Sequence, residues 1–316
     1  MTCEYDDGAA RTEPLQRNHQ RLPGDDPSCA HWRRICYSIS AQSRLNATVR
    51  RCNERRLMRS LRSICSNAII AAVLWAVPVE ARTLTAIKTD GTLKVGLTGD
   101  YAPYSLRGVD GRIAGADVTI AQMLAKALGV ALEIVPTTWK SMTSDFKADR
   151  FDIAMGGVSI TAERAAIGYF SVTVVSDGKR PIVRCADKDR YVSVAAIDQS
   201  DVRVIVNPGG TNEAFAKAHL PHAKLEEHPD NRTIFDVIAA GRADVMVTDG
   251  AEVDYQSRRH PGVLCPAGVP QAFDHFDKAY WMTRDPALKA AIDAALSKSL
   301  DAGDYQRALT EAAGSP

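Results

Sequence analysis

Hydrophobic residues along the chain form short apolar runs separated by segments of helical character. Runs bounded by glycine, proline or polar turn residues predict strands at 93–97, 131–135, 151–155, 202–206 and 244–247. The segments between them predict helices at 117–128, through 146–147, at 213–218 and at 233–240. In the first helix, Asp117 is expected to be the cap and Gly129 the stop, since apolar residues recur between them at four-residue steps.

Strands that alternate with helices are typical of βαβ units, so each series predicts a largely parallel sheet. The series occurs twice, which predicts two α/β lobes with a ligand cleft between them. No linker rich in Ser, Gly or Pro separates the two series, so we expect two hinge strands to join the lobes. The expected boundaries are 82–183 plus 266–316 for a discontinuous first lobe and 184–265 for the second lobe.

The first 81 residues do not share this pattern. A basic stretch with Arg59 and Arg62, an apolar run at 68–77 and the small-x-small sequence Val79-Glu80-Ala81 predict a signal peptide over 58–81. The apolar run is about half of the roughly 20 residues that span a bilayer. We therefore expect export by the Sec route, cleavage after Ala81 and no membrane insertion after cleavage.

Residues 1–57 carry ten arginines, no lysine and four cysteines, without a sustained helical or strand period. Such a segment does not resemble a domain that buries a core. We interpret it as untranslated sequence upstream of the true start, or as a disordered leader. A basic nucleic-acid-binding arm is the alternative, but the export signal that follows argues against that function.

The charge balance and the cysteine content after residue 81 limit the kinds of binding partner and of crosslink that the chain can be expected to have. This part carries 27 Lys and Arg against 30 Asp and Glu, so nothing in it indicates nucleic acid or a membrane surface. Of the seven cysteines, only Cys185 and Cys265 lie in it. In an oxidising compartment two cysteines suggest one disulfide, expected near the interlobe crossings; two separate buried thiols are the alternative.

Three short motifs resemble the amino-acid-type periplasmic solute-binding proteins: Thr98-Gly99-Asp100-Tyr101, the loop Ser159–Arg164 and the strand end Thr248-Asp249. The likeness runs from about Leu84 to Tyr305. Longer strings, in the right order, resemble the cyclohexadienyl dehydratases within that group: DRFDIAMGGVSIT, DGKRPI, NPGGTNE, HPDNRTIF and QSRRHP.

That resemblance implies a type II periplasmic-binding-protein fold and a periplasmic location. It also implies a carbon–oxygen lyase that converts prephenate to phenylpyruvate and arogenate to phenylalanine, with no metal and no organic cofactor. The expected partner is this small-molecule substrate, and a homo-oligomer is left open. A non-catalytic amino-acid-binding protein of an ABC transporter shares the fold and the export signal, and is the alternative function.

The resemblance assigns the proton donor to Glu252, three residues after Asp249 at a strand end expected to face the cleft. To carry a proton when substrate arrives, this acid needs a pKa raised by desolvation. Without the resemblance, a solvated glutamate at a helix start is the alternative. Asp249 is expected to line the same cleft.

The resemblance also supplies substrate-binding residues. Arg164 is expected to hold a carboxylate with its planar fork, beside Ser159, although a surface pair with Glu163 is the alternative. Trp139 is expected to form an aromatic wall, with core packing as the alternative, and Lys179 to hold an anion unless it is a solvated turn lysine.

The loop from Asn207 to Asn212 opens onto a predicted helix, whose first amides favour an anion. Within it, Gly209 and Gly210 are expected to let the backbone approach that anion, and Asn207, Gly210, Thr211 and Asn212 are expected to contact the substrate. An ordinary strand-to-helix turn capped by Thr211 or Asn212 is the alternative.

Two other chemistries find little support in the sequence. The histidines at 219, 222, 228, 260 and 275 match no helical zinc motif, so no metal site is expected. No Gly-x-Ser-x-Gly elbow is present, as a Ser-His-Asp hydrolase on such a fold would need.

Overall fold

The computed structural model of the protein describes residues 82–314. The signal peptide expected over 58–81 and the segment 1–57 lie outside the described residues. Within 82–314 no helix has both the length and the apolar content that a membrane span requires.

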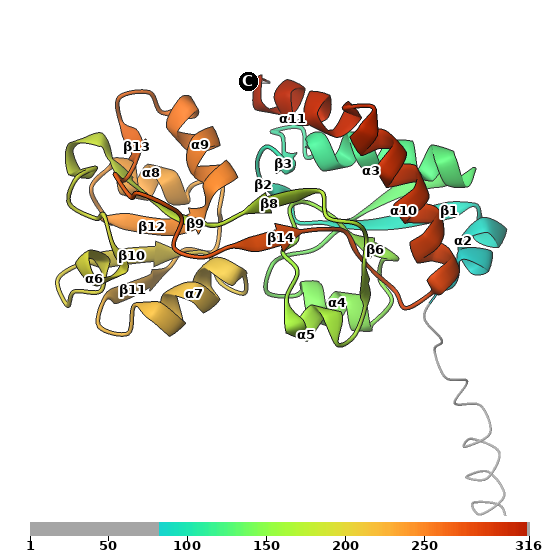
Figure 1. Ribbon diagram of the computed structural model, residues 1–316, viewed down its shortest axis with the longest axis horizontal. Coiled ribbons are helices and arrows are strands. Elements are labelled where there is room, and N and C mark those ends of the chain that lie inside the picture. The colour runs from blue at the N-terminus through green and yellow to red at the C-terminus, as the bar shows by residue number, and fades with distance from the viewer. Residues whose placement is uncertain (1–81, 315–316) are drawn as a thin grey trace, which may run out of the picture. The chain divides into compact units, whose positions relative to one another are not determined.

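Strands and helices alternate along this part of the chain (Figure 1). The elements of the first lobe, up to and including the strand β8 that leaves it, are α2 Leu84–Asp90, β1 Thr92–Leu97, β2 Asp100–Tyr101, β3 Ser105–Arg107, β4 Ile113–Ala114, α3 Ala116–Leu128, β5 Ala131–Pro136, α4 Met142–Lys147, β6 Ile153–Ala154, α5 Ala162–Ala165, β7 Tyr169–Phe170 and β8 Val175–Asp177. The elements of the second unit are β9 Lys179–Arg184, the 3₁₀ turn Cys185–Asp187, α6 Val194–Ile197, β10 Arg203–Val206, α7 Thr211–His219, β11 Lys224–Glu227, α8 Ile234–Ala239, β12 Val245–Asp249, α9 Gly250–Arg259 and β13 Leu264–Pro266. The chain returns through β14 Phe276–Lys278 and β15 Trp281–Met282 and ends in α10 Pro286–Asp301 and α11 Asp304–Gly314.

Each lobe is built on a five-stranded sheet, with strand order β5-β1-β6-β15-β7 in the first lobe and β11-β10-β12-β9-β13 in the second. The strands that precede crossover helices pair in parallel, as the alternating pattern predicts: β1 with β5 and β6, and β10 with β11 and β12. The strands next to the crossings, β9, β13 and β15, pair antiparallel with their neighbours. Both sheets are therefore mixed rather than largely parallel.

The two lobes are joined by β8 and β14, which pair with each other as a separate antiparallel ribbon (Figure 1). This agrees with the two hinge strands expected from the sequence. The strand β9 lies entirely in the second sheet, so the expected boundary between residues 183 and 184 falls inside it. The sequence does not show that β9 belongs to the second lobe. No helix separates β9 from the hinge strand before it, so the two strands look like one continuous segment.

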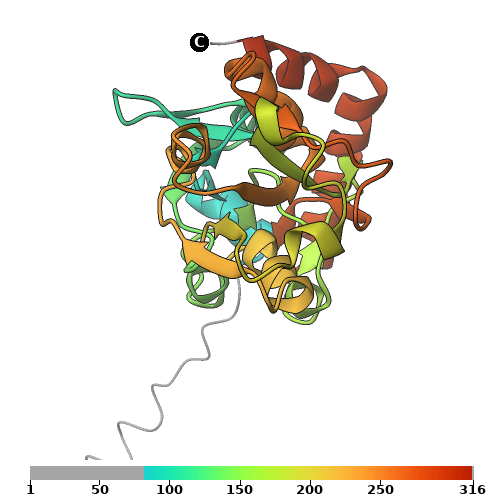
Figure 2. The same cartoon turned by 90° about the vertical axis from the view of Figure 1, so that its left-hand side faces the viewer.

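Alternating burial explains why the second sheet carries helices on both faces. Along β10, Val204 and Val206 pack with α6 and α7, whereas Ile205 between them packs with α8 and α9. Successive side chains of a strand point to opposite faces, so a fully apolar strand needs cover on both sides. Figure 2, turned by 90°, shows α7 in yellow and α9 in orange on opposite sides of the sheet.

Asp117 is not the cap of the first long helix. The N-cap of α3 is Gly115, and Asp117 is buried inside its first turn. Its carboxylate accepts from the backbone amides of Gly156 and Gly157 and from the hydroxyl of Tyr280. The prediction was wrong because a carboxylate in the first helical turn suits a cap and a tertiary anchor equally well. Gly129 ends α3 in the left-handed conformation, as expected.

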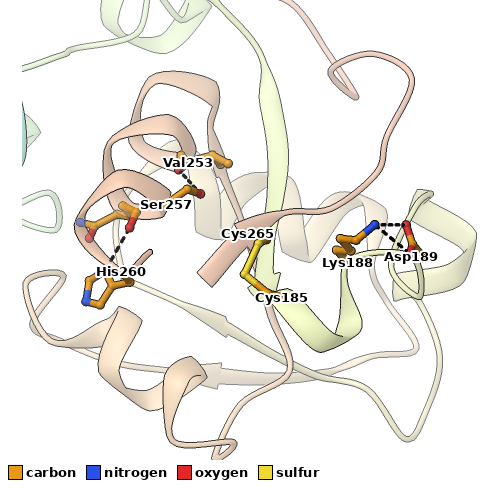
Figure 3. Close-up of a disulfide and its surroundings, with 8 residues drawn as sticks. Cys185, Lys188, Asp189, Val253, Ser257, His260 and Cys265 are labelled. Atoms are coloured by element: carbon orange, nitrogen blue, oxygen red, sulfur yellow. Dashed lines mark hydrogen bonds and ion pairs between the residues drawn. A yellow bond between two sulfur atoms is a disulfide. The ribbon is translucent and has the colours of Figure 1, made fainter. Parts of the chain in front are cut away.

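Cys185 and Cys265 form a disulfide with Cα atoms 4.7 Å apart, across a separation of 80 residues (Figure 3). The bridge links the end of β9 to β13. Cys185 lies six residues along the chain from Lys179, which begins β9 at the hinge, so the bridge is at the far end of the strand rather than near the crossings. It fastens the edge of the second sheet.

Replacing both cysteines by serine is expected to lower the free energy of unfolding by about 2–4 kcal/mol, because the bridge constrains a long loop in the unfolded chain. Urea unfolding of the mature chain with and without reductant measures this difference, and the double variant should not respond to reductant. Mass spectrometry of the unreduced protein should find no free thiol, and two free thiols would contradict the pairing.

Candidate functional site

A small pocket with a cavity volume of about 20 Å³ lies between the two lobes and receives side chains from both. Its wall contains nine of the ten residues that the sequence analysis placed in the site, all except Lys179. The lining residues are Tyr101, Trp139, Gly157, Ser159 and Arg164 from the first lobe, and Asn207, Gly210, Thr211, Asn212, Asn231, Asp249 and Glu252 from the second. Residues that are far apart in sequence therefore meet at strand ends, where such folds bind ligands.

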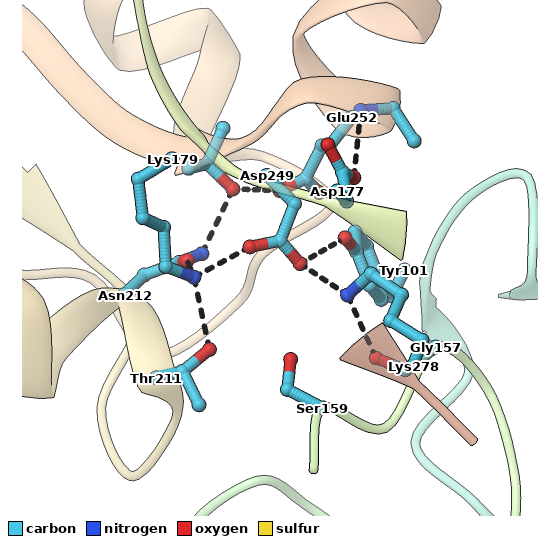
Figure 4. Close-up of polar contacts among 12 residues, drawn as sticks. Tyr101, Gly157, Ser159, Asp177, Lys179, Thr211, Asn212, Asp249, Glu252 and Lys278 are labelled. Carbon is cyan, nitrogen blue, oxygen red and sulfur yellow. Dashed lines mark hydrogen bonds and ion pairs between the residues drawn. The ribbon is translucent and has the colours of Figure 1, made fainter. Parts of the chain in front are cut away.

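Asp249, the last residue of β12, is the centre of a buried ionic cluster (Figure 4). One carboxylate oxygen accepts from Lys179 Nζ at 2.5 Å, and the other accepts from Lys278 Nζ at 2.5 Å and from the hydroxyl of Tyr101. Lys278 Nζ also donates to the carbonyl oxygen of Gly157 at 3.0 Å. The cluster thus binds the end of β12 to the first lobe through Tyr101 and Gly157.

Burial alone would raise the pKa of the Asp249 carboxyl, but the ammonium groups of Lys278 and Lys179 hold it well below its usual range. Asp249 is therefore ionised at any physiological pH. Two ammonium groups on one carboxylate leave the cluster with one net positive charge. Arg164 adds another, so the pocket suits an anionic ligand.

Lys179 does not line the pocket. Its side chain is only 1% exposed, and its ammonium group donates to Thr211 Oγ1 at 2.9 Å and Asn212 Oδ1 at 2.5 Å besides Asp249. Burial lowers the pKa of Lys179, against the attraction of Asp249. This lysine is not a solvated turn residue, and it fixes side chains that form the wall.

Glu252, in the first turn of α9, is 1% exposed and so is not the solvated glutamate of the alternative reading. Its carboxyl oxygens accept from Asn231 Nδ2 at 2.9 Å and from Thr248 Oγ1 at 2.5 Å. Burial raises the pKa of Glu252 to about 8, and the negative charge of Asp249 adds to this, while the hydrogen bond from Thr248 opposes it. Glu252 is therefore mostly protonated at neutral pH, which is the state a general acid requires.

A chain of hydrogen bonds fixes the orientation of this carboxyl. Lys179 can only donate, so the Asn212 amide turns its oxygen toward the lysine and its nitrogen toward Thr248, 2.8 Å from the hydroxyl oxygen. Thr248 must then use its own hydrogen for Glu252. The hydrogen-bond orientations of three side chains, Asn212, Thr248 and Glu252, are thus set by one buried ammonium group.

The backbone that carries Glu252 is held by the hinge. The carboxylate of Asp177, the last residue of β8, accepts from the amide of Ala251 at 3.1 Å. Gly250 has no Cβ, which would stand 2.6 Å from Asp177 Oδ1. The glycine at 250 has no evident reason in the sequence, and this close approach of a hinge carboxylate to the start of α9 provides it.

Arg164 lies in the four-residue helix α5, whose N-cap is Thr161. The residue is 8% exposed, and its Nη1 donates to the carbonyl oxygen of Ser159 at 2.9 Å. No carboxylate among residues 82–314 forms an ion pair with it, so the expected alternative of a pair with Glu163 is not observed. Burial lowers the pKa of Arg164 to about 10, which leaves it charged and available to an anion. Figure 4 shows the hydroxyl of Ser159 directed toward the Asp249 cluster.

The loop 207–212 leads into α7, whose N-cap is Gly210 with no capping side chain. The alternative of a cap by Thr211 or Asn212 is not observed, because both side chains bond to Lys179. Gly209 adopts φ +87°, and a Cβ there would lie 2.3 Å from Lys140 Cα in the first lobe. Gly209 is thus needed where the two lobes touch, and only Gly210 borders the pocket.

Trp139 lies at the edge between core and pocket. Its indole nitrogen donates to Asp100 Oδ1 at 3.1 Å, and its ring meets Tyr101 edge-on at 5.8 Å between centroids. The residue lines the pocket and also packs against the buried cluster around Phe151 and Trp281. The two readings of Trp139 as wall and as core residue therefore both apply.

Five residues of the site were not predicted as such: Tyr101, Gly157, Asn231, Thr248 and Lys278. The first four lie within or beside motifs that carry the resemblance, so their position in those strings was a usable signal. Lys278 lies in β14, where the sequence shows only an isolated lysine. Elsewhere in the chain from 82 to 314, no three His, Cys, Asp or Glu side chains gather as a metal ion would need.

The class of protein follows from this fold and site and from the sequence match. Residues 93–314 match the bacterial extracellular solute-binding proteins, family 3, and the chain belongs to that family.

Two individual relatives show which proteins within the family this chain is similar to. Cyclohexadienyl dehydratase of Pseudomonas aeruginosa is 46% identical over 237 residues, which cover 74% of this chain and 88% of that protein. The L-cystine-binding protein TcyJ of Escherichia coli is 28% identical, over 60% of this chain and 71% of that protein.

Solved structures agree with the fold. An ancestral amino acid-binding protein named as a precursor of cyclohexadienyl dehydratase matches with a TM-score of 0.66 and 32% identity, over 72% of this chain and 97% of that one. An arginine-bound amino acid transporter substrate-binding protein of Streptococcus pneumoniae matches with a TM-score of 0.67 and 28% identity, over the same shares of the two chains.

Proposed function

We propose that the protein is a periplasmic cyclohexadienyl dehydratase, a carbon–oxygen lyase that converts prephenate to phenylpyruvate and arogenate to phenylalanine. The observation that carries this proposal is Glu252, a buried carboxyl that is protonated at neutral pH and lies in the wall of a cationic pocket. A transport receptor has to hold its ligand but has no use for a transferable proton. The 46% identity to the dehydratase of Pseudomonas aeruginosa supports the same activity.

In the proposed reaction, two bonds of the substrate ring break: the bond from carbon to the hydroxyl oxygen and the bond from carbon to the ring carboxylate. The electrons of the second bond complete the aromatic ring, and the carboxylate leaves as carbon dioxide. Glu252 gives its proton to the departing oxygen, which leaves as water, and then takes a proton from solvent before the next turnover. Aromatisation drives the reaction, so one positioned acid in a desolvated pocket suffices.

Binding is assigned to the groups that face the acid. Arg164 would take a substrate carboxylate with the guanidinium nitrogens that Ser159 leaves free. The first amides of α7 would add a second anion site, because they and the helix dipole favour negative charge. Trp139 would contact the ring. The chemistry uses no metal and no organic cofactor.

The periplasm is proposed as the location because the family consists of extracellular solute-binding proteins. The signal peptide over 58–81 stays a prediction, which the N-terminal sequence of the secreted protein would test.

Incubation of the purified mature chain with prephenate tests the proposed activity, by the appearance of phenylpyruvate absorbance at alkaline pH. The expected result is steady product formation proportional to protein concentration, and the matched control is the Glu252→Gln variant at the same concentration. A flat trace together with tight binding of a free amino acid would favour the receptor.

A further inference from the structure

Asn231, in the loop before α8, has a buried carbonyl oxygen with no partner. The residue is 2% exposed and lines the pocket beside Glu252. Its Nδ2 donates to Glu252 Oε1 at 2.9 Å and to the backbone oxygen of Asp100 at 3.1 Å, which uses both amide hydrogens. Its Oδ1 accepts no hydrogen bond from any residue in 82–314.

The orientation of this amide is determined by its neighbours. A flipped amide would turn its oxygen toward the carbonyl oxygen of Asp100, and two acceptors would then face each other. The orphaned oxygen is therefore a property of the site. A buried acceptor without a donor costs free energy, so the pocket is built for a ligand that supplies a hydrogen at this point.

This requirement can be compared with the substrate of the proposed function. The carboxylates and the keto group of prephenate only accept hydrogen bonds, and its ring hydroxyl is the one donor. That hydroxyl is also the group that must receive the proton of Glu252. Because Asn231 is bonded directly to Glu252, an oxygen placed between them can donate to Asn231 Oδ1 and accept from the Glu252 carboxyl.

We propose that Asn231 is a catalytic residue that binds the departing ring hydroxyl, accepting its hydrogen at Oδ1 while Glu252 protonates the oxygen. This inference rests on the proposed function and adds to it the subsite for the leaving group. The hydroxyl keeps its own hydrogen throughout, gains the proton of Glu252 as the carbon–oxygen bond breaks, and departs as water. Asn231 itself neither gains nor loses a proton.

Other charged groups around Glu252 do not offer this contact. Asp249, from the end of β12, has both oxygens occupied by the ammonium groups of Lys179 and Lys278 and by the hydroxyl of Tyr101. Asp100, from β2, accepts from the indole of Trp139. Asn207 has the second orphaned oxygen in the pocket but no hydrogen bond to Glu252, and so it is a matched control.

The experiment uses two analogues of prephenate with a saturated ring, which cannot aromatise: one with the ring hydroxyl and one without. Calorimetry measures their dissociation constants for the mature wild-type chain, Asn231→Leu and Asn207→Leu. The wild type should bind the hydroxyl form about tenfold more tightly, as for one hydrogen bond to a buried acceptor. Asn231→Leu should lose this preference to within about twofold, whereas Asn207→Leu should keep it.

Persistence of the tenfold preference in Asn231→Leu, or its loss in Asn207→Leu alone, would overturn the proposal. If thermal melting shows that Asn231→Leu does not fold, Asn231→Ala is measured in its place with the same expected loss. Turnover of prephenate by the wild type is followed in the same preparation. Turnover without a hydroxyl preference refutes the role of Asn231 but leaves the dehydratase function intact, and absence of turnover refutes the function separately.

Discussion

Replacing Glu252 by glutamine is expected to lower the turnover number for prephenate by about 10²–10⁴-fold, the usual effect of losing a general acid. Glutamine keeps the shape of the side chain and can still accept from Thr248 or Asn231, but it has no proton to transfer. The Michaelis constant should change little, because the carboxylate-binding groups remain. Steady-state kinetics of wild type and variant measure both quantities, and Glu226→Gln, an exposed glutamate of β11, is the matched control.

The pH dependence follows from the same carboxyl. Burial raises the pKa of Glu252 to about 8, so the protonated, active form predominates below that pH and is lost as the pH rises through it. Wild-type turnover should therefore decline on the alkaline side, and the residual turnover of Glu252→Gln should lack this decline. An unchanged alkaline limb in the variant, or near-wild-type turnover, would show that the proton comes from another group.

The fold could be predicted from the sequence because its main signals are local. The strands and helices of both lobes follow from short apolar runs and from glycines such as Gly129, whose left-handed backbone ends α3. Two details could not be predicted because they depend on distant partners. β6 is limited to Ile153 and Ala154, and the side chain of the preceding Asp152 accepts from the amide of Lys94 and from the side chain of Arg82. Similarly, the place of β9 in the second sheet is decided by its pairing with β12.

The candidate site was predicted only in part, and the prediction came from sequence motifs rather than from local apolar patterns. The chemistry of Arg164 and Glu252 could be inferred from the motifs that contain them, and both lie in the pocket wall. No pattern in the sequence indicated Lys278, whose function depends on contacts with Asp249 and Gly157 from two other segments. The sequence also assigned Lys179 to the ligand, because a sequence shows which charges are present but not which are already paired.

Arg164→Lys is expected to raise the Michaelis constant for prephenate by about 10–100-fold although the positive charge is kept. One guanidinium nitrogen is held by the carbonyl oxygen of Ser159, which aims the remaining fork into the pocket, and an ammonium group cannot both hold that oxygen and bind a carboxylate at two points. Loss of one charged hydrogen bond corresponds to about 1.5–3 kcal/mol, which gives the expected range.

Arg284→Lys provides the matched control for this change. Arg284 donates to the backbone oxygens of Ala165 and Ala166, next to Arg164 in sequence, but its side chain lies at the surface outside the pocket wall. Its substitution should leave the Michaelis constant within about twofold, as is usual for surface positions. Thermal melting of both variants separates a loss of folding from a loss of binding. Equal Michaelis constants for wild type and Arg164→Lys would contradict the binding role of Arg164. They would mean that the buried guanidinium only holds the Ser159 loop in place. The substrate carboxylate would then be bound elsewhere, and the first amides of α7 are the remaining group suited to it.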